Sequence, residues 1–86
     1  MPELSRFLGI VIAMFVKEHN PPHFHAYYNE FEVQIEIESG KIMQGYLPRR
    51  SLNLVQDWRE LHIKELMHNW EVGRKTGQFT KIEPLE

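Results

Sequence analysis

The sequence predicts an α+β fold, in which a small antiparallel β-meander of about four strands precedes a C-terminal helical segment packed on one face of the sheet. Two observations support this prediction. β-branched and apolar residues, interrupted by turn signals, fill the first half of the chain, whereas apolar residues recur at steps of three and four from residue 48 onward. With 86 residues in the chain, we expect residues 1–86 to form a single domain around one modest core.

The first expected strand is residues 7–16, where β-branched and apolar residues occupy both alternating sets of positions. A strand of this kind is covered on both faces or lies next to a partner. One layer of helices covers only one face of a sheet. We therefore expect a homodimer or a protein partner to cover the other face of this strand.

Composition narrows the cellular setting. The apolar run of residues 8–16 is too short to span a bilayer and lacks the pattern of a signal peptide. The chain has no cysteine, so it has no disulfide and no thiolate metal site, and a reducing compartment fits best. We therefore expect a cytoplasmic protein without a membrane segment. A formal net charge of −2 argues against binding nucleic acid through overall charge, although a local basic patch stays compatible with it.

Residues 23–28 and 31–38 are predicted to form a hairpin around the two-residue link Asn29-Glu30. That link sets the register, so that one face of the hairpin is apolar or aromatic and the other carries two histidines. The apolar face pairs Tyr28 with Phe31, Ala26 with Val33 and Phe24 with Ile35, and the polar face pairs Tyr27 with Glu32, His25 with Gln34 and His23 with Glu36.

The helical segment is expected over residues 48–75, with Gly73 or Gly77 at its end. A single helix of that length is unusual in so small a domain. A break between residues 61 and 64, giving two helices, is therefore an alternative to one continuous helix.

Two further segments complete the expected architecture. Ser39 and Gly40 form a turn into a fourth strand over residues 41–47. Residues 79–86 form either a short edge strand through residues 81–83 or a tail.

The candidate functional site is the segment of residues 18–25, EHNPPHFH, which holds three of the five histidines. His23 and His25 leave the same face of a strand with Cα atoms roughly 6.6 Å apart, a separation from which two imidazoles can bind one metal ion at about 2.0–2.1 Å. His19 is the candidate third ligand and Glu36 the fourth, with zinc or another transition metal as the ion. The alternative is a hydrogen-bonded surface network or a stiff loop without metal.

A metal-free catalytic role would use His23 or His25 as general base, with Glu36, Glu18 or Tyr27 as the orienting or acidic partner. Such a set suffices to cleave RNA, which supplies its own 2′-hydroxyl nucleophile. No serine or cysteine lies close in sequence, so acyl transfer is disfavoured. The residues alone leave both an enzyme and a non-catalytic protein open.

Arg49 and Arg50 lie where the helical segment begins, which is the unfavourable end of a helix for cations. Two guanidiniums beside free N–H groups bind a phosphate or a partner's carboxylate well. The pair is therefore a candidate site for an anion or a partner. The alternative is that both arginines are solvated or pair with Glu36, Glu38 or Asp57.

Segments along nearly the whole chain resemble one bacterial family, which is catalogued as domain of unknown function 4160. The resemblance rests on MPELSRF at residues 1–7, GIVIAM at 9–14, HNPPHFH at 19–25, GYLP at 45–48, and the pattern of Leu52-Asn53-Leu54-Val55, Trp58, His62, Glu65-Leu66 and Asn69-Trp70. It implies a small protein without an established activity, similar to the toxin halves of type II toxin–antitoxin pairs and often encoded beside another small protein.

Two functional hypotheses follow. The resemblance implies the toxin-like half of a two-protein pair, in which one surface binds a small cognate antitoxin-like protein and the histidine segment acts on a target such as RNA. The alternative is a non-catalytic binding or assembly module whose histidine cluster is structural or binds a metal.

Overall fold

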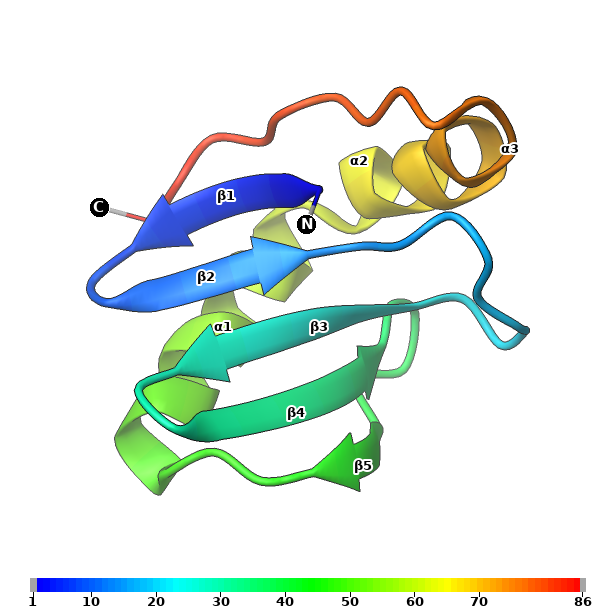
Figure 1. Ribbon diagram of the computed structural model, residues 1–86. Coiled ribbons are helices and arrows are strands. Elements are labelled where there is room, and N and C mark those ends of the chain that lie inside the picture. The colour runs from blue at the N-terminus through cyan, green and yellow to red at the C-terminus, as the bar shows by residue number, and fades with distance from the viewer. Residues whose placement is uncertain (1, 86) are drawn as a thin grey trace.

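The computed structural model describes residues 2–85, which form an antiparallel five-stranded sheet followed by helices (Figure 1). This confirms the predicted α+β class, with five strands in place of about four. The strands lie in the sheet in the order in which they occur in sequence: β1 (Glu3–Phe7), β2 (Ile10–Ala13), β3 (His23–Tyr28), β4 (Phe31–Glu36) and β5 (Ile42–Gly45).

The additional strand is β1, which lies almost entirely before residues 7–16, and that run is not one strand as predicted, since only residues 10–13 of it form β2. The chain reverses at Leu8 and Gly9, and Phe7 of β1 pairs with Ile10 of β2. Both turn residues have positive φ angles, 51° at Leu8 and 82° at Gly9, as a two-residue hairpin turn requires. An aliphatic residue at such a position does not signal a turn, so the uninterrupted apolar run concealed it.

The β3–β4 hairpin has the predicted register at every pair from His23 with Glu36 to Tyr28 with Phe31. Asn29 takes a φ of 53°, a conformation that asparagine tolerates, so the turn forms without glycine. Period-two alternation therefore sends Phe24 and Ala26 toward the core and the two histidines to the opposite face.

The helical segment is broken at His62, as the alternative prediction allowed. It consists of α1 (Arg49–Leu61), α2 (Ile63–His68), the π-helix η1 (Asn69–Gly73) and α3 (Arg74–Thr76), and it ends at Gly77 with a φ of 81°. Among residues 2–85, no helix combines the length and apolar character needed to cross a membrane.

Helix α1 packs on one face of the sheet, behind it in the view of Figure 1, and forms the main core there. Its fully buried Trp58 places its ring 5.7 Å from that of Phe7 and 6.0 Å from that of Phe24, measured between centroids. We call the sheet face that carries His23 and His25, on the side away from α1, the outer face.

The chain after α3 returns along β1 (Figure 1). The backbone N–H of Ile82 donates to the carbonyl of Leu4 at 2.8 Å, and the indole N–H of Trp58 donates to the carbonyl of Glu83 at 2.8 Å. Residues 81–83 therefore cover the free edge of β1, although the hydrogen bonding is too sparse to make them a strand.

Candidate metal site on the outer face

Strand β3 presents His23 and His25 on the outer face, yet their residues are only 4% and 7% exposed. Two aromatic rings cover them. Phe15, in the loop after β2, meets His25 edge-on at 4.8 Å, and Trp70 of η1 lies 5.3 Å from His23, both between ring centroids. The C-terminal helical segment thus reaches both faces of the sheet, through Trp58 on one and Trp70 on the other.

Glu18 completes a compact group with the two histidines. One potential ligand atom from each of Glu18, His23 and His25 lies within 4.8 Å of the others. The Nε2 atom of His23 is 3.3 Å from Oε1 of Glu18, and Nε2 of His25 contacts the same oxygen. Two imidazoles and one carboxylate therefore converge on one small region.

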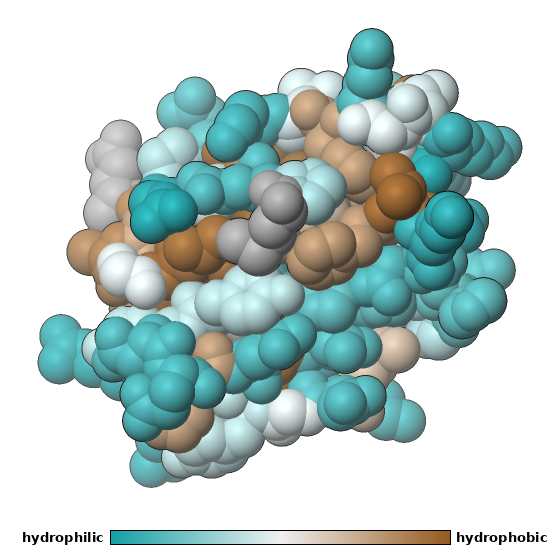
Figure 2. Space-filling view, in the orientation of Figure 1, coloured by the Kyte–Doolittle hydropathy of each residue, from teal (hydrophilic) through white to brown (hydrophobic). Residues whose placement is uncertain are grey.

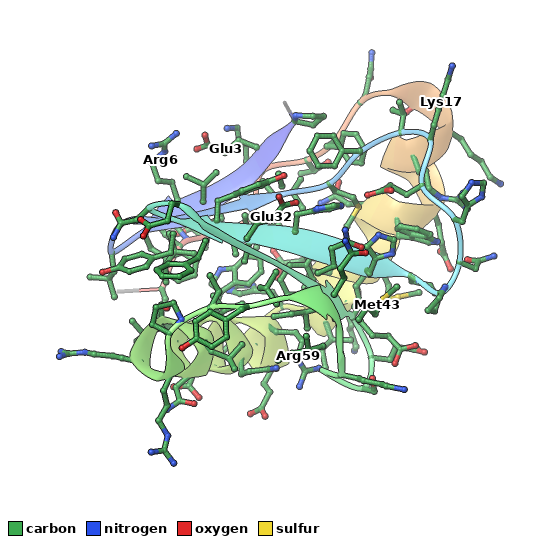
Figure 3. All side chains as sticks on the ribbon, turned by 60° about the horizontal axis from the view of Figure 1, so that its bottom comes forward. Glu3, Arg6, Lys17, Glu32, Met43 and Arg59 are labelled. Atoms are coloured by element: carbon green, nitrogen blue, oxygen red, sulfur yellow. The ribbon has the colours of Figure 1, made fainter. Side chains whose placement is uncertain are left out.

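The other ring nitrogens show how the imidazoles are oriented. The backbone carbonyl of Pro21 lies 2.9 Å from Nδ1 of His23, and the carboxylate of Glu32 lies 3.1 Å from Nδ1 of His25 (Glu32 is labelled in Figure 3). Because both oxygens can only accept, each Nδ1 donates its proton. For His23, this tautomer of the neutral imidazole directs the lone pair of Nε2 toward Glu18. His25 faces a carboxylate at each nitrogen, so its Nε2 donates to Glu18 unless a metal ion takes the place of that proton.

This arrangement leaves a buried ring nitrogen without a hydrogen-bond partner. Nε2 of His23 makes no hydrogen bond within the described residues, although Oε1 of Glu18 is 3.3 Å away. Most buried polar atoms in folded proteins are paired. Converging lone pairs of Glu18, His23 and His25 need either a proton or a metal ion between them, so the group can hold a metal ion.

Glu18 is suited to a cationic neighbour. Burial raises the pKa of its carboxyl, but the hydrogen bond from His25 and the electrostatic attraction of both histidines outweigh burial, and the net pKa is lowered. Nearby Tyr27 behaves oppositely, because burial and the charges of Glu32 and Glu18 raise its pKa. Glu18 is therefore anionic near neutral pH, and Tyr27 stays a neutral phenol that cannot serve as a base near neutral pH.

Arg74 of α3 holds the loop that carries Glu18. Its Nη1 donates to the backbone carbonyl of Glu18 at 3.0 Å, and its guanidinium carbon lies 4.4 Å from the ring centre of Trp70. The guanidinium thus links the loop to the C-terminal helical segment. Sequence reasoning missed Arg74 and Trp70 because no local pattern connects them with the histidines. The predicted hairpin register did place Glu32 on the same face as His25, but did not assign it to the site.

The structure brings together only some of the residues that the sequence nominated. His19 is exposed and lies outside the group of potential ligands. Glu36 lies opposite His23 in the sheet as predicted, but its carboxylate accepts a hydrogen bond from the hydroxyl of Ser39 and is also outside the group. Glu18, which the sequence suggested as a catalytic partner, lies with His23 and His25 in the group of potential ligands instead.

Arg49 and Arg50 lie at the predicted start of a helix. They are the first two residues of α1, both are exposed, and neither forms a salt bridge within residues 2–85. They lie at the end of the sheet opposite the histidines, because Arg50 shares a groove with Tyr28 at the far end of β3.

Comparisons with known proteins agree with the resemblance described above. No curated protein and no solved structure matches the chain. Residues 9–71 match the family described as "Domain of unknown function (DUF4160)", a span that includes the histidine segment, α1 and α2. The chain therefore belongs to the DUF4160 family.

Proposed function

We propose that this protein binds one transition-metal ion, for which zinc is the best match, through Glu18, His23 and His25. The observation that carries the proposal is the buried Nε2 of His23, which has no hydrogen-bond partner and is directed at an anionic carboxylate. A ligand set of two imidazole nitrogens and one carboxylate oxygen suits zinc, whereas magnesium and calcium prefer oxygen ligands alone.

The contacts around the ligands support the same assignment. Histidine ligands of metal ions usually donate their second N–H to a carboxylate or a backbone carbonyl, which fixes the ring and increases its basicity. Glu32 and the carbonyl of Pro21 occupy these two positions here. A hydrogen-bonded surface network would not require both imidazoles to present the same nitrogen to one carboxylate.

The ion would fasten the loop before β3 to the sheet, since Glu18 lies in that loop and both histidines lie on β3. Three protein ligands leave one position of a tetrahedral zinc ion for water or for a group from another molecule. The histidines are almost fully covered by Phe15 and Trp70. This shielding favours a structural ion in a non-catalytic module over a hydrolytic centre.

The test is zinc stoichiometry and thermal stability, measured before and after chelation. We expect about one zinc per chain, and a melting temperature that falls when a chelator removes the ion, because an ion that binds only the folded state stabilises it. His23→Ala and Glu18→Gln should both lose the ion. His19→Ala is the matched control, since it removes a neighbouring histidine that lies outside the group.

The zinc content of these variants distinguishes the proposed ligand set, which includes Glu18, from the set inferred from the sequence, which includes His19. If His19→Ala loses zinc as completely as His23→Ala, the ligand set first inferred from the sequence is the correct one. A wild-type protein that takes up no zinc on reconstitution would refute the proposal. Glu18→Gln guards against misfolding of the buried His23 variant, because Glu18 is only partly buried.

The role as the toxin-like half of a two-protein pair rests on the resemblance. In that role a proton, rather than a metal, would lie between Glu18 and the histidines, and His25 would act as acid or base on RNA. The test is growth inhibition on expression, which His25→Ala should relieve while the protein still folds. Absence of inhibition by the wild-type chain would count against this role.

A further inference from the structure

A groove lies at the end of the sheet farthest from the histidines, where the β1–β2 turn, the end of β3 and the start of α1 meet. Its volume is about 250 Å³. Leu8, Ile10, Tyr28 and Leu54 supply its apolar lining, and Arg50 adds a positive charge. In the space-filling view, brown side chains gather on the left, near the β1–β2 turn (Figure 2).

Leu8 occupies a position that neither the turn nor the core explains. It is 60% exposed, so it adds little to the core, and its φ of 51° is a left-handed conformation that disfavours bulky side chains. Asparagine or glycine adopts this conformation readily. A residue that breaks a local rule without a gain in packing indicates a role in contact with another molecule.

The charge beside the groove also lacks a partner in the described part of the chain. Helix α1 has no acidic residue in its first turn and no side-chain cap, and it begins with Arg49 and Arg50. Cations at this end of a helix are unfavourable on their own. A carboxylate from another molecule in the groove would be favoured by the guanidinium of Arg50 and by the free N–H groups of the first turn.

We propose that this groove docks a segment of a partner protein in which a large apolar side chain lies beside an Asp or Glu. The apolar side chain would contact Leu8, Tyr28 and Leu54, and the carboxylate would pair with Arg50. This combination of a buried apolar contact and a charge pair at the rim is common in protein interfaces.

The lining argues for a protein rather than RNA. Single-stranded nucleic acids bind where aromatic rings stack on bases along a strongly basic groove. Here Tyr28 is the aromatic residue of the lining, the other apolar contacts are aliphatic, and the chain carries a net charge of −2. The proposal does not depend on the metal site, which lies on the other face and at the other end of β3.

The test is selection of random peptides displayed on phage against the immobilised protein, followed by fluorescence anisotropy with one enriched peptide. We expect enriched peptides to carry Asp or Glu next to Leu, Ile, Met or Phe. Leu8→Asn should weaken binding by at least about tenfold, as loss of an apolar anchor does. Arg50→Gln should also weaken it, whereas the control Lys64→Gln, which removes a charge from α2, should not.

Leu8→Asn also separates binding from folding, because asparagine suits the left-handed turn position and the variant should melt no lower than the wild type. Four outcomes would overturn the proposal: no enrichment, enriched peptides without acidic residues, binding by Leu8→Asn within about twofold of wild type, or displacement of the peptide by single-stranded RNA. A dimer that loses affinity on Leu8→Asn would also overturn it, by assigning the groove to a second copy of the chain.

Discussion

Replacing Glu32 by glutamine tests whether the contacts behind the histidines serve a metal ion. Glu32 is not one of the proposed metal ligands. It acts only through His25, because the carboxylate of Glu32 lies 3.1 Å from Nδ1 of His25. The variant keeps a side-chain oxygen that can accept this hydrogen bond but removes the negative charge. We expect the protein to bind zinc with unchanged stoichiometry and reduced affinity.

The expected magnitude follows from the position of Glu32. Removing an outer partner of a metal-bound histidine costs about 10- to 100-fold in affinity, or about 1.4–2.8 kcal/mol. The side chain is 48% exposed and glutamine can still accept, so the loss should lie near tenfold. Metal-free stability should change by no more than about 0.5 kcal/mol, as for most surface substitutions.

The assay is competition for zinc against a chromophoric chelator, with urea unfolding of the metal-free protein as the check on stability. Glu30→Gln is the matched control, because it removes the same charge from an exposed position of the same hairpin. If zinc were attracted only by overall negative charge, both variants would weaken it equally. Equal zinc affinities for Glu32→Gln and Glu30→Gln would refute the reasoning.

Three further predictions concern stability. Because the pKa of Glu18 is lowered in the folded state, its contribution is present above the unfolded-state value of about 4.3 and is lost as pH falls through the folded value; metal-free Glu18→Gln should therefore lose less stability than wild type on acidification, measured by urea unfolding. Gly45→Ala should lower the urea midpoint much more than Gly77→Ala, since both have positive φ but only at Gly45 would a new Cβ come within 2.2 Å of a backbone oxygen, against 4.0 Å for the nearest atom at Gly77; equal midpoints would contradict this. Trp58→Ala should cost about 3–5 kcal/mol in free energy of unfolding, and a loss under about 1 kcal/mol would show that α1 is not the main cover of the core.

The parts of the fold that sequence reasoning predicted correctly are those governed by local periodicity. The β3–β4 register followed from alternation and the two-residue Asn29-Glu30 link. The helical segment was predicted to end at Gly73 or Gly77, and it ends at Gly77. The β1–β2 hairpin was missed because the apolar run of residues 7–16 continues across its turn at Leu8 and Gly9. Leu8 gave no turn signal, because an aliphatic residue rarely adopts the left-handed conformation that it has in this turn.

In the candidate site, too, local periodicity predicted some residues, whereas the others depend on contacts between distant parts of the chain. The pair of His23 and His25 was predictable, because two residues apart on a strand always share a face. Glu18, and neither His19 nor Glu36, lies in the group of potential ligands with the two histidines. The path of the loop before β3 decides which of its side chains reaches the sheet, and the hydroxyl of Ser39 donates a hydrogen bond to the carboxylate of Glu36. Arg74 lies 56 residues from its contact on Glu18, beyond the reach of any pattern in one sequence.

Strand β3 connects the proposed metal site, the core and the groove. Its odd-numbered residues, His23 and His25, point to the outer face, and its even-numbered residues, Phe24 and Ala26, enter the core. Tyr28 continues the even set into the groove, about 17 Å along the strand from His23 at 3.4 Å per residue. Since the two sites lie on opposite faces and at opposite ends, a metal ion can stabilise the loop before β3 without altering the groove beyond it.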